Sequence, residues 1–337
     1  MLGRATARAE QQMPRFYLGI DGGQTATTAV ICDEAGSLLG VGRAGPADHV
    51  WEPGGVARAR RAVTGSVSRA WRAAGARPVT FEAAFLGMTG GNERTVAAIR
   101  RSVRARQFRL ENDAVTALAC TTEGKPGVVV IAGTGTIAYG ENARGRTETA
   151  SGWGYLLGDE GGGFWIARQA IAAACRGHDG RGERTALEGL LLEAAGVDGL
   201  WELHRLIYSG RMSRAEMAGL AAVAPRAAAR GDRAARRVLV QAGRELGLAA
   251  GVVARKLGMA RGRLRVGMVG GVFGGSEEVR RDFRREVRRH APRAEFSEAR
   301  FAPAVGSVLL ALKLAGVRIT PGLLGNLDAA SAAVGPK

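Results

Sequence analysis

The sequence predicts an α/β protein with two lobes, and three observations lead to this expectation. The chain has 337 residues, 46% of them hydrophobic, which is long enough for two sizeable cores. Two stretches, residues 17–25 (YLGIDGGQT) and 128–136 (VVVIAGTGT), each consist of an apolar run and a glycine-rich turn, and a second apolar segment follows each of them. Segments of helical periodicity follow each stretch, so the chain is expected to alternate strands with helices and to repeat itself weakly.

The first lobe is expected to open with three short antiparallel strands, at about 16–20, 29–32 and 38–41. An Asp-Gly-Gly turn would join the first two of them. The remaining expected elements are a helix at 55–74, a strand at 81–88, a short arginine-rich helix, a brief strand at 108–110 and a helix at 114–120.

The second lobe is expected to start with a short β-branched run at 128–132, which favours a buried strand. Alternating apolar residues resume at Ile137, so the glycine turn between them is interpreted as a hairpin tip. The later expected elements are helices at 164–174, 184–195, 197–207, 213–230 and 233–257, a strand at 264–269, a helix at 276–290, a strand near 295–296 and a helix at 303–315.

These elements divide the chain into predicted parts. Residues 1–14 are expected to be a disordered extension, 15–126 the first lobe and 127–302 the second, while a helix at 303–317 rejoins the first lobe. The end of the chain, 320–337, is small, polar and glycine-bearing, and is expected to be flexible.

The net charge of +17 raises the question of a nucleic-acid partner. Of the 48 basic residues only four are lysines, and the arginines are spread over most expected helices. The densest cluster, at 280–289, alternates with Phe283 and Val287, as on the solvated face of an amphipathic helix. No nucleic-acid partner is therefore expected, although the positive field would attract anionic nucleotides.

Membrane and redox signals are weak. No run approaches the ~18 apolar residues that a spanning helix requires, and the first residues lack the apolar core of a signal peptide. Three scattered cysteines, Cys32, Cys120 and Cys175, have no metal-ligand spacing and are interpreted as buried free thiols. The expectation is a protein of the reducing cytoplasm with no membrane partner.

Two glycine turns could bind phosphate. Asp21 ends the first apolar run and precedes Gly22, Gly23 and Thr25. An acid, two glycines and a hydroxyl in this order can hold a hydrated Mg²⁺ and cradle phosphate oxygens. The turn at 133–136 (GTGT) offers N–H groups and two hydroxyls. For both turns, a plain hairpin is the alternative interpretation.

Three further stretches could contribute to a site. Residues 151–163 place Trp153 near Asp159 and Glu160 among glycines, which suits a polyhydroxylated ligand. Asp113 begins a predicted helix and could be an N-cap or a general base. The glycine pair Gly270-Gly271 could let an adenine lie flat on the backbone, or could be an ordinary strand-to-helix turn.

These motifs resemble those of the sugar-kinase/heat-shock-70/actin superfamily. They resemble more closely the BadF/BadG/BcrA/BcrD-type ATPase family, and within it the N-acetylglucosamine kinases. The resemblance rests on five motifs. They are the two phosphate-type turns, Asn112-Asp113-Ala114, Gly270 to Phe273, and residues 151–161, which match the sugar signature GGWGxxLGDEG except at Ser151. The resemblance covers about 16–317, and five motifs in order make it specific.

The resemblance implies two ribonuclease-H-like lobes, each a mixed five-stranded sheet with helices, around a cleft for ATP and Mg²⁺. It also implies transfer of the γ-phosphate to a sugar 6-hydroxyl, with Asp113 taking the proton and Asp21 holding the metal through water. The residues that would bind ATP are Gly22, Gly23, Thr25, Gly133, Thr134, Gly135, Gly270 and Gly271. Those that would bind the sugar are Asp48, Asn112, Asp113, Trp153, Gly154, Asp159 and Glu160. A homodimer is implied by the family alone.

The expected acceptor is N-acetylglucosamine, with glucosamine second. The family's usual asparagine in the first-lobe sugar loop is Asp48 here, and a carboxylate facing the 2-position would favour an ammonium group. Three rivals remain: a dehydratase activator with an iron–sulfur cluster, a sugar-responsive repressor and an arginine-rich nucleic-acid binder. The cysteine positions, the short leading segment and the dispersed arginines, respectively, count against them.

Overall fold

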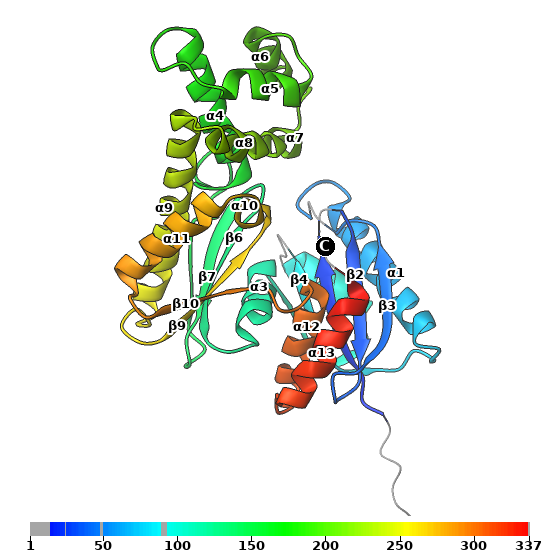
Figure 1. Cartoon of the computed structure of the whole chain (residues 1–337). Helices are drawn as coiled ribbons and strands as arrows, with labels where there is room; N and C mark the ends of the chain where they lie inside the picture. The colour runs from blue at the N-terminus through cyan, green and yellow to red at the C-terminus, as the bar shows by residue number, and fades with distance from the viewer. Residues whose placement is uncertain (1–13, 24, 48–49, 89–92, 336–337) are drawn as a thin grey trace, which may run out of the picture. The chain divides into compact units, whose positions relative to one another are not determined.

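The computed structural model describes residues 14–23, 25–47, 50–88 and 93–335 (Figure 1). The chain forms two compact units. The first unit comprises Met1–Asn112 and Ala302–Lys337, and the second comprises Asp113–Phe301. Each unit contains one five-stranded sheet.

The sheet of the first unit has the order β3-β2-β1-β4-β5. Its strands are β1 (Tyr17–Gly22), β2 (Thr27–Cys32), β3 (Leu38–Ala44), β4 (Phe81–Met88) and β5 (Ala105–Glu111). The first three are antiparallel, whereas β1, β4 and β5 are parallel. Every residue of the central strand β1 is buried, because helices cover both of its faces.

Glycines let those helices approach the first sheet closely. A Cβ at Gly42 of β3 would lie 2.0 Å from the Ser66 carbonyl oxygen in α1 (Gly55–Ala73). On the opposite face, a Cβ at Gly19 of β1 would lie 2.3 Å from the Ala304 carbonyl oxygen in α12 (Pro303–Leu314). The other helices of this unit are α2 (Glu93–Arg100) and α13 (Pro321–Val334).

The second sheet repeats the plan of the first. Its order is β10-β9-β6-β7-β8, again three antiparallel strands continued by two parallel ones. The strands are β6 (Gly127–Ala132), β7 (Thr136–Glu141), β8 (Thr147–Ala150), β9 (Leu264–Val269) and β10 (Ala294–Glu298). The predicted internal repeat is therefore confirmed at the level of topology.

Helices of the second unit form a large core with this sheet. The sheet-covering helices are α3 (Asp113–Thr122), α9 (Arg233–Lys256), α10 (Gly271–Gly275) and α11 (Glu277–His290). A separate helical group comprises α4 (Gly163–His178), α5 (Leu187–Ala195), α6 (Leu200–Tyr208), α7 (Arg214–Gly219), the 3₁₀ turn η1 (Leu220–Ala222) and α8 (Val223–Ala229). The predicted capping box of Ser213 and Glu216 is present at the start of α7.

The α/β class with two mixed five-stranded sheets is confirmed, and two boundaries differ from expectation. The sequence placed the division between lobes at 126/127, but α3 packs against β6 and β9, so the second unit begins at Asp113. The end of the chain, expected to be flexible over 320–337, forms α13, whose Leu323 and Leu327 are buried.

Smaller differences concern single elements. The helix expected at 213–230 is broken into α7, η1 and α8, and the elements β8 and α10 were not anticipated. The expected extension 1–14 lies, except for Pro14, outside the described residues. Within the described ranges, no helix is long and apolar enough to cross a membrane.

Candidate active site

The β6–β7 turn is held against the start of α4. The Gly133 N–H donates to the Gly135 carbonyl oxygen at 3.0 Å, closing the hairpin that the sequence predicted. The N–H groups of Gly163 and Phe164 donate to the carbonyl oxygens of Gly133 and Thr134 at 2.8 and 3.1 Å. Because the turn's carbonyls are occupied by α4, its shape is fixed by the fold before any ligand binds.

The buried carboxylate of Asp159 lies against this turn. A Cβ at Gly135 would lie 2.4 Å from Asp159 Oδ2, so any larger residue would displace the carboxylate from this position. Asp159 is 5% exposed and has a left-handed backbone, with φ of 59°. A non-glycine residue in that region costs about 1 kcal/mol, which identifies Asp159 as a position where the local backbone is strained.

The loop between β8 and Asp159 presents apolar side chains to solvent. Trp153 is 75% exposed and Leu157 is 80% exposed. The loop is closed by hydrogen bonds from the N–H groups of Leu157 and Gly158 to the Gly154 carbonyl oxygen. It is anchored by Tyr155, whose ring meets the Phe164 ring edge-on at 4.9 Å. Glu160 follows and is half-buried.

Ser151, the one departure from the sugar signature, has a compensating contact. Its φ of 63° lies in the left-handed region, where a glycine costs nothing. Its hydroxyl is 2.9 Å from the Thr136 hydroxyl at the start of β7, which ties the loop to the glycine hairpin. A single hydrogen bond contributes about 1 kcal/mol, which is comparable to the free energy that a left-handed backbone costs at a non-glycine residue such as Ser151.

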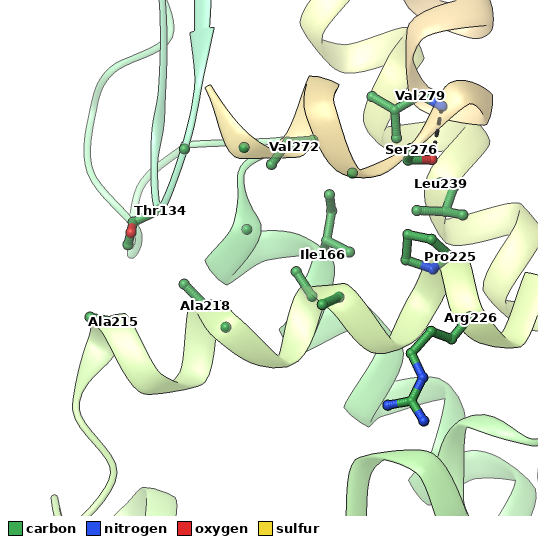
Figure 2. A pocket seen from close by; sticks show the side chains of 17 residues that line it. Thr134, Ile166, Ala215, Ala218, Pro225, Arg226, Leu239, Val272, Ser276 and Val279 are labelled. Atoms are coloured by element: carbon green, nitrogen blue, oxygen red, sulfur yellow. Dashed lines mark hydrogen bonds between the residues drawn. The ribbon is translucent and has the colours of Figure 1, made fainter. Parts of the chain in front are cut away.

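A cavity of about 640 Å³ opens beside the hairpin, entirely within the second unit (Figure 2). It brings together three residues predicted to bind ATP: Gly133, Thr134 and Gly271. The cavity is large enough for a nucleoside. A Cβ at Gly133 or Gly271 would meet no atom within 4 Å, so both glycines leave open space beside their backbone.

Gly270 precedes Gly271 and fixes the path of the backbone at the wall of the cavity that Gly271 lines. Its φ is 107°, and a Cβ there would lie 2.3 Å from the Ala132 carbonyl oxygen in β6. Only glycine therefore permits β9 to turn into α10 at this point. The opposite wall is a face of small residues that the sequence analysis did not single out: Ala215, Ala218, Gly219 and Ala222, continued by Pro225 and Arg226. Their spacing of three and four residues is a helical period, a signal that could have indicated this face.

The predicted phosphate turn of the first unit carries a buried acid. Asp21 lies in β1 and is 5% exposed. Its neighbour Gly22 packs so closely on β4 that a Cβ would lie 2.6 Å from Met88 Cγ. The Gly23 N–H donates to the Ala26 carbonyl oxygen at 3.0 Å, and Thr25 is exposed. Asp48, one of the expected sugar residues of this unit, lies outside the described residues.

These groups suit a magnesium ion that arrives with a nucleotide. Magnesium is commonly held by one or two carboxylates together with water and phosphate oxygens. Asp21, one residue before the end of β1, is the carboxylate of this turn that would hold the ion. Across the part of the chain that the structure describes, no cluster of three His, Cys, Asp or Glu residues forms a ready metal cage.

Asn112 and Asp113 join β5 to α3. Asp113 is the first residue of α3 and is half-buried, while Asn112 is exposed. Neither residue lines the 640 Å³ cavity. The structure thus groups Gly133–Gly135, Asp159 and Gly271 at one end of the second sheet, and leaves the roles of Asn112 and Asp113 as predictions.

The cysteines are free in the structure. Cys32 in β2 and Cys120 in α3 are buried, as expected, whereas Cys175 in α4 is only partly buried. Burial raises the pKa of Cys32 to about 12, with the nearby Asp33 charge adding to the effect, so this thiol stays protonated at neutral pH.

A family model matches residues 18–311, and it spans the hairpin turns, α3, the sugar-signature loop and the Gly270 turn. The chain belongs to the BadF/BadG/BcrA/BcrD ATPase family. The match ends inside α12, so α13 lies beyond it.

Two curated relatives are sugar kinases by name. The N-acetylmuramic acid/N-acetylglucosamine kinase of Clostridium acetobutylicum is 36% identical over 200 residues, which is 59% of this chain and 65% of that protein. The match thus spans slightly less than two thirds of that relative. The N-acetyl-D-glucosamine kinase of Dictyostelium discoideum is 28% identical over 88% of this chain and 98% of that protein.

A solved structure shares the fold over most of both chains. It is that of a candidate N-acetylglucosamine kinase from Chromobacterium violaceum, with a TM-score of 0.70 and 28% identity over 88% of this chain and 99% of that one. Together with the paired sheets, this confirms the expected fold of two ribonuclease-H-like units, as in the actin-like ATPases.

Proposed function

We propose that this protein is an ATP-dependent amino-sugar kinase that transfers the γ-phosphate to the 6-hydroxyl of N-acetylglucosamine. The observation that carries the proposal is the contact between Gly135 and the Asp159 carboxylate. It places the residue expected to hold the sugar directly beside the turn expected to hold phosphate. The names of the curated relatives support the same reaction class.

The nucleoside of ATP is proposed to occupy the cavity beside Gly271. The small side chains of α7 and η1 and the bare backbone at Gly271 offer two apolar walls that suit a flat base. Thr134 and Gly135 then donate hydrogen bonds to phosphate oxygens from the rigid hairpin. Five further residues are also proposed to bind ATP. They are Gly22, Gly23 and Thr25 in the first turn, Gly133 in the second turn, and Gly270 next to the wall that faces the base.

The sugar is proposed to be held by the loop after β8. Trp153 offers a flat apolar face, and Asp159 and Glu160 accept hydrogen bonds from sugar hydroxyls. Gly154, Asn112 and Asp48 complete the proposed set. Because Asp159 is buried and held at a strained backbone position, its carboxylate is already oriented before the sugar binds.

Asp113 is proposed as the general base. It would accept the proton of the 6-hydroxyl as the oxygen attacks, and the start of a helix is a rigid place for such a group. Asp21 is proposed to hold a magnesium ion, which when bound neutralises phosphate charge. Phosphoryl transfer depends mostly on the positioning of the reactants and on stabilisation of charge. Two rigid turns and two well-positioned carboxylates, Asp113 and Asp21, would therefore be sufficient for this reaction.

A cytoplasmic location and a homodimer are part of the proposal and rest on the cysteine pattern and on the family, respectively. Glucosamine is the second candidate acceptor because of Asp48. The test is a coupled assay of ADP release across N-acetylglucosamine, glucosamine, N-acetylmuramate and glucose. We expect kcat/KM to be highest for N-acetylglucosamine. If the protein strongly prefers glucosamine and Asp48→Asn reverses this preference, glucosamine replaces N-acetylglucosamine as the proposed acceptor. If none of the four sugars causes ADP release, the proposal is refuted.

A further inference from the structure

The C-terminal helix α13 ends beside the acid proposed to hold magnesium. A small cavity of about 30 Å³ in the first unit is lined by Asp21 of β1, Arg43 of β3, and Val334 and Gly335 at the end of α13. Its volume is about that of one water molecule. Asp21, Arg43 and the end of α13 therefore border the same small cavity.

The sheet itself aligns the two charged side chains. Asp21 pairs with Thr28 of β2, and Thr28 pairs with Arg43 of β3. Residues paired in register point to the same face of a sheet, and two strand spacings separate Asp21 from Arg43 by about 10 Å at the backbone. Thr28 lines the same cavity, as do Pro303 and Ala304 at the start of α12. The long arginine side chain on this edge strand thus extends over the face that carries Asp21.

The structure shows what the Arg43 guanidinium contacts. Its Nη2 donates a hydrogen bond to the carbonyl oxygen of Val334, the last residue of α13. The final carbonyls of a helix lack partners within it and carry the negative end of its dipole, so they attract a cation. Contacts elsewhere hold this end in place: the Ala302 N–H donates to Ser331 Oγ at 2.6 Å, and the side chains of Leu327 and Val334 are buried.

We propose that α13 sets the affinity for magnesium by holding the Arg43 guanidinium at its C-terminal end, away from the Asp21 carboxylate. The inference rests on the proposed role of Asp21. A guanidinium released from Val334 would turn to the buried carboxylate two strands away and would compete with Mg²⁺ for it. Arg43 is in this sense a positioning residue, and α13 is the element that keeps it in position.

The main variant removes the tether with minimal damage. A chain ended after Ala333, with its C-terminus amidated so that no new carboxylate holds Arg43, loses the Val334 carbonyl and one buried side chain. A chain ended after Gly335 and amidated in the same way keeps both and is the matched control. In the shorter chain we expect the Mg²⁺ concentration for half-maximal activity to rise about fivefold or more, with kcat at saturating Mg²⁺ little changed. Mn²⁺ binding to the ADP-saturated protein, followed by the electron paramagnetic resonance of free Mn²⁺, should weaken by a similar factor without any turnover.

The decisive measurement is whether Arg43→Met suppresses the loss of metal affinity in the shortened chain. Arg43→Met in the shortened chain removes the competing charge and should restore Mg²⁺ and Mn²⁺ affinity to near the control. If the shortened chain does not fold, Ser331→Ala loosens the end of α13 in the full-length chain, and Arg43→Met should suppress its smaller effect in the same way. Unchanged metal affinity in the variant tested, or failure of Arg43→Met to restore it, would overturn the inference.

Two further outcomes separate the inference from the proposed function. If Asp21→Ala left the Mg²⁺ dependence and Mn²⁺ binding unchanged, both the role of Asp21 and the inference would be wrong. If Asp21→Ala abolished metal binding but Arg43→Met in the full-length chain weakened ADP binding, the role of Asp21 would stand. Arg43 would then contact the nucleotide itself, and the inference alone would be overturned.

Discussion

Replacing Gly135 by alanine tests the contact that carries the proposed function. The new Cβ would lie 2.4 Å from Asp159 Oδ2 and 2.9 Å from its Cγ, both well inside normal contact distance. The backbone at Gly135 is not left-handed, so alanine is tolerated by the turn itself. The side chain that must move is the short Asp159 carboxylate, and relief of the contact requires a displacement of about 1 Å.

A displacement of this size is small for stability and large for function. Overpacking of this kind costs about 1–3 kcal/mol, which leaves the protein folded. Misplacement of a binding group by about 1 Å can cost about 10²-fold, or roughly 2.7 kcal/mol. We therefore expect Gly135→Ala to lower kcat/KM for N-acetylglucosamine about 100-fold while the melting temperature falls by only a few degrees.

Gly133→Ala is the matched control, because it lies in the same turn and its Cβ would meet no atom within 4 Å. It should raise KM for ATP, since Gly133 lines the cavity, and should leave the sugar kinetics nearly unchanged. The assay is ADP release with each substrate varied in turn. Normal sugar kinetics in Gly135→Ala, or equal losses in the two variants, would refute the reasoning.

Three other changes give separate tests. Asp113→Asn should lower turnover about 10²–10⁴-fold without unfolding the protein, and near-normal turnover would mean that Asp113 only begins the helix. Gly270→Ala forces a left-handed alanine against the Ala132 carbonyl oxygen, so the free energy of unfolding in urea should fall by about 3 kcal/mol or more. Burial opposes ionisation of Asp232, but hydrogen bonds from the starts of α5 and α9 outweigh it and lower the pKa of this carboxyl. Its stabilisation is therefore present above the unfolded pKa of about 3.9 and is lost as the pH falls through the folded pKa. Asp232→Ala should cost about 1–2 kcal/mol at pH 7 and less at pH 3, and an equal cost at both would contradict this account.

The sequence was most informative where local physical chemistry decides the structure. The β-branched run before Gly133 and the strand Leu264–Val269 formed as predicted, because short apolar runs bounded by glycine have few alternatives. The glycine turns were also found from the sequence, since positive φ and close backbone approach require that residue, as at Gly270.

Part of what escaped prediction was present in the sequence, and part depends on tertiary contacts. The segment 321–334 carries helix signals that the sequence analysis missed: Thr320 caps it, Pro321 lies in its first turn, and apolar residues recur at a helical spacing. Its Leu323, Leu327 and Val334 are buried in the first unit. The start of the second unit was misplaced because α3 packs on β6 and β9 through contacts such as Thr121 against Gly267. No local pattern specifies such a partner.

The candidate site was predicted as a set of residues, but its arrangement was not. Gly135 and Asp159 are far apart along the chain, and nothing in either motif indicates that the acid needs the space that glycine leaves. The wall of small residues in α7 and η1 was missed because alanines on a helix usually indicate only packing. Asp48 lies outside the described residues, so its role stays a prediction.

The most direct test of the central claim is the site of phosphorylation in the product. The protein is incubated with ATP, Mg²⁺ and N-acetylglucosamine, and the sugar phosphate is analysed by two-dimensional ³¹P–¹H NMR correlation. Besides the resonances of ADP, the proposed function predicts one phosphomonoester resonance coupled to the two protons on carbon 6. A phosphate coupled to the anomeric proton, or release of inorganic phosphate with no sugar phosphate formed, would contradict it.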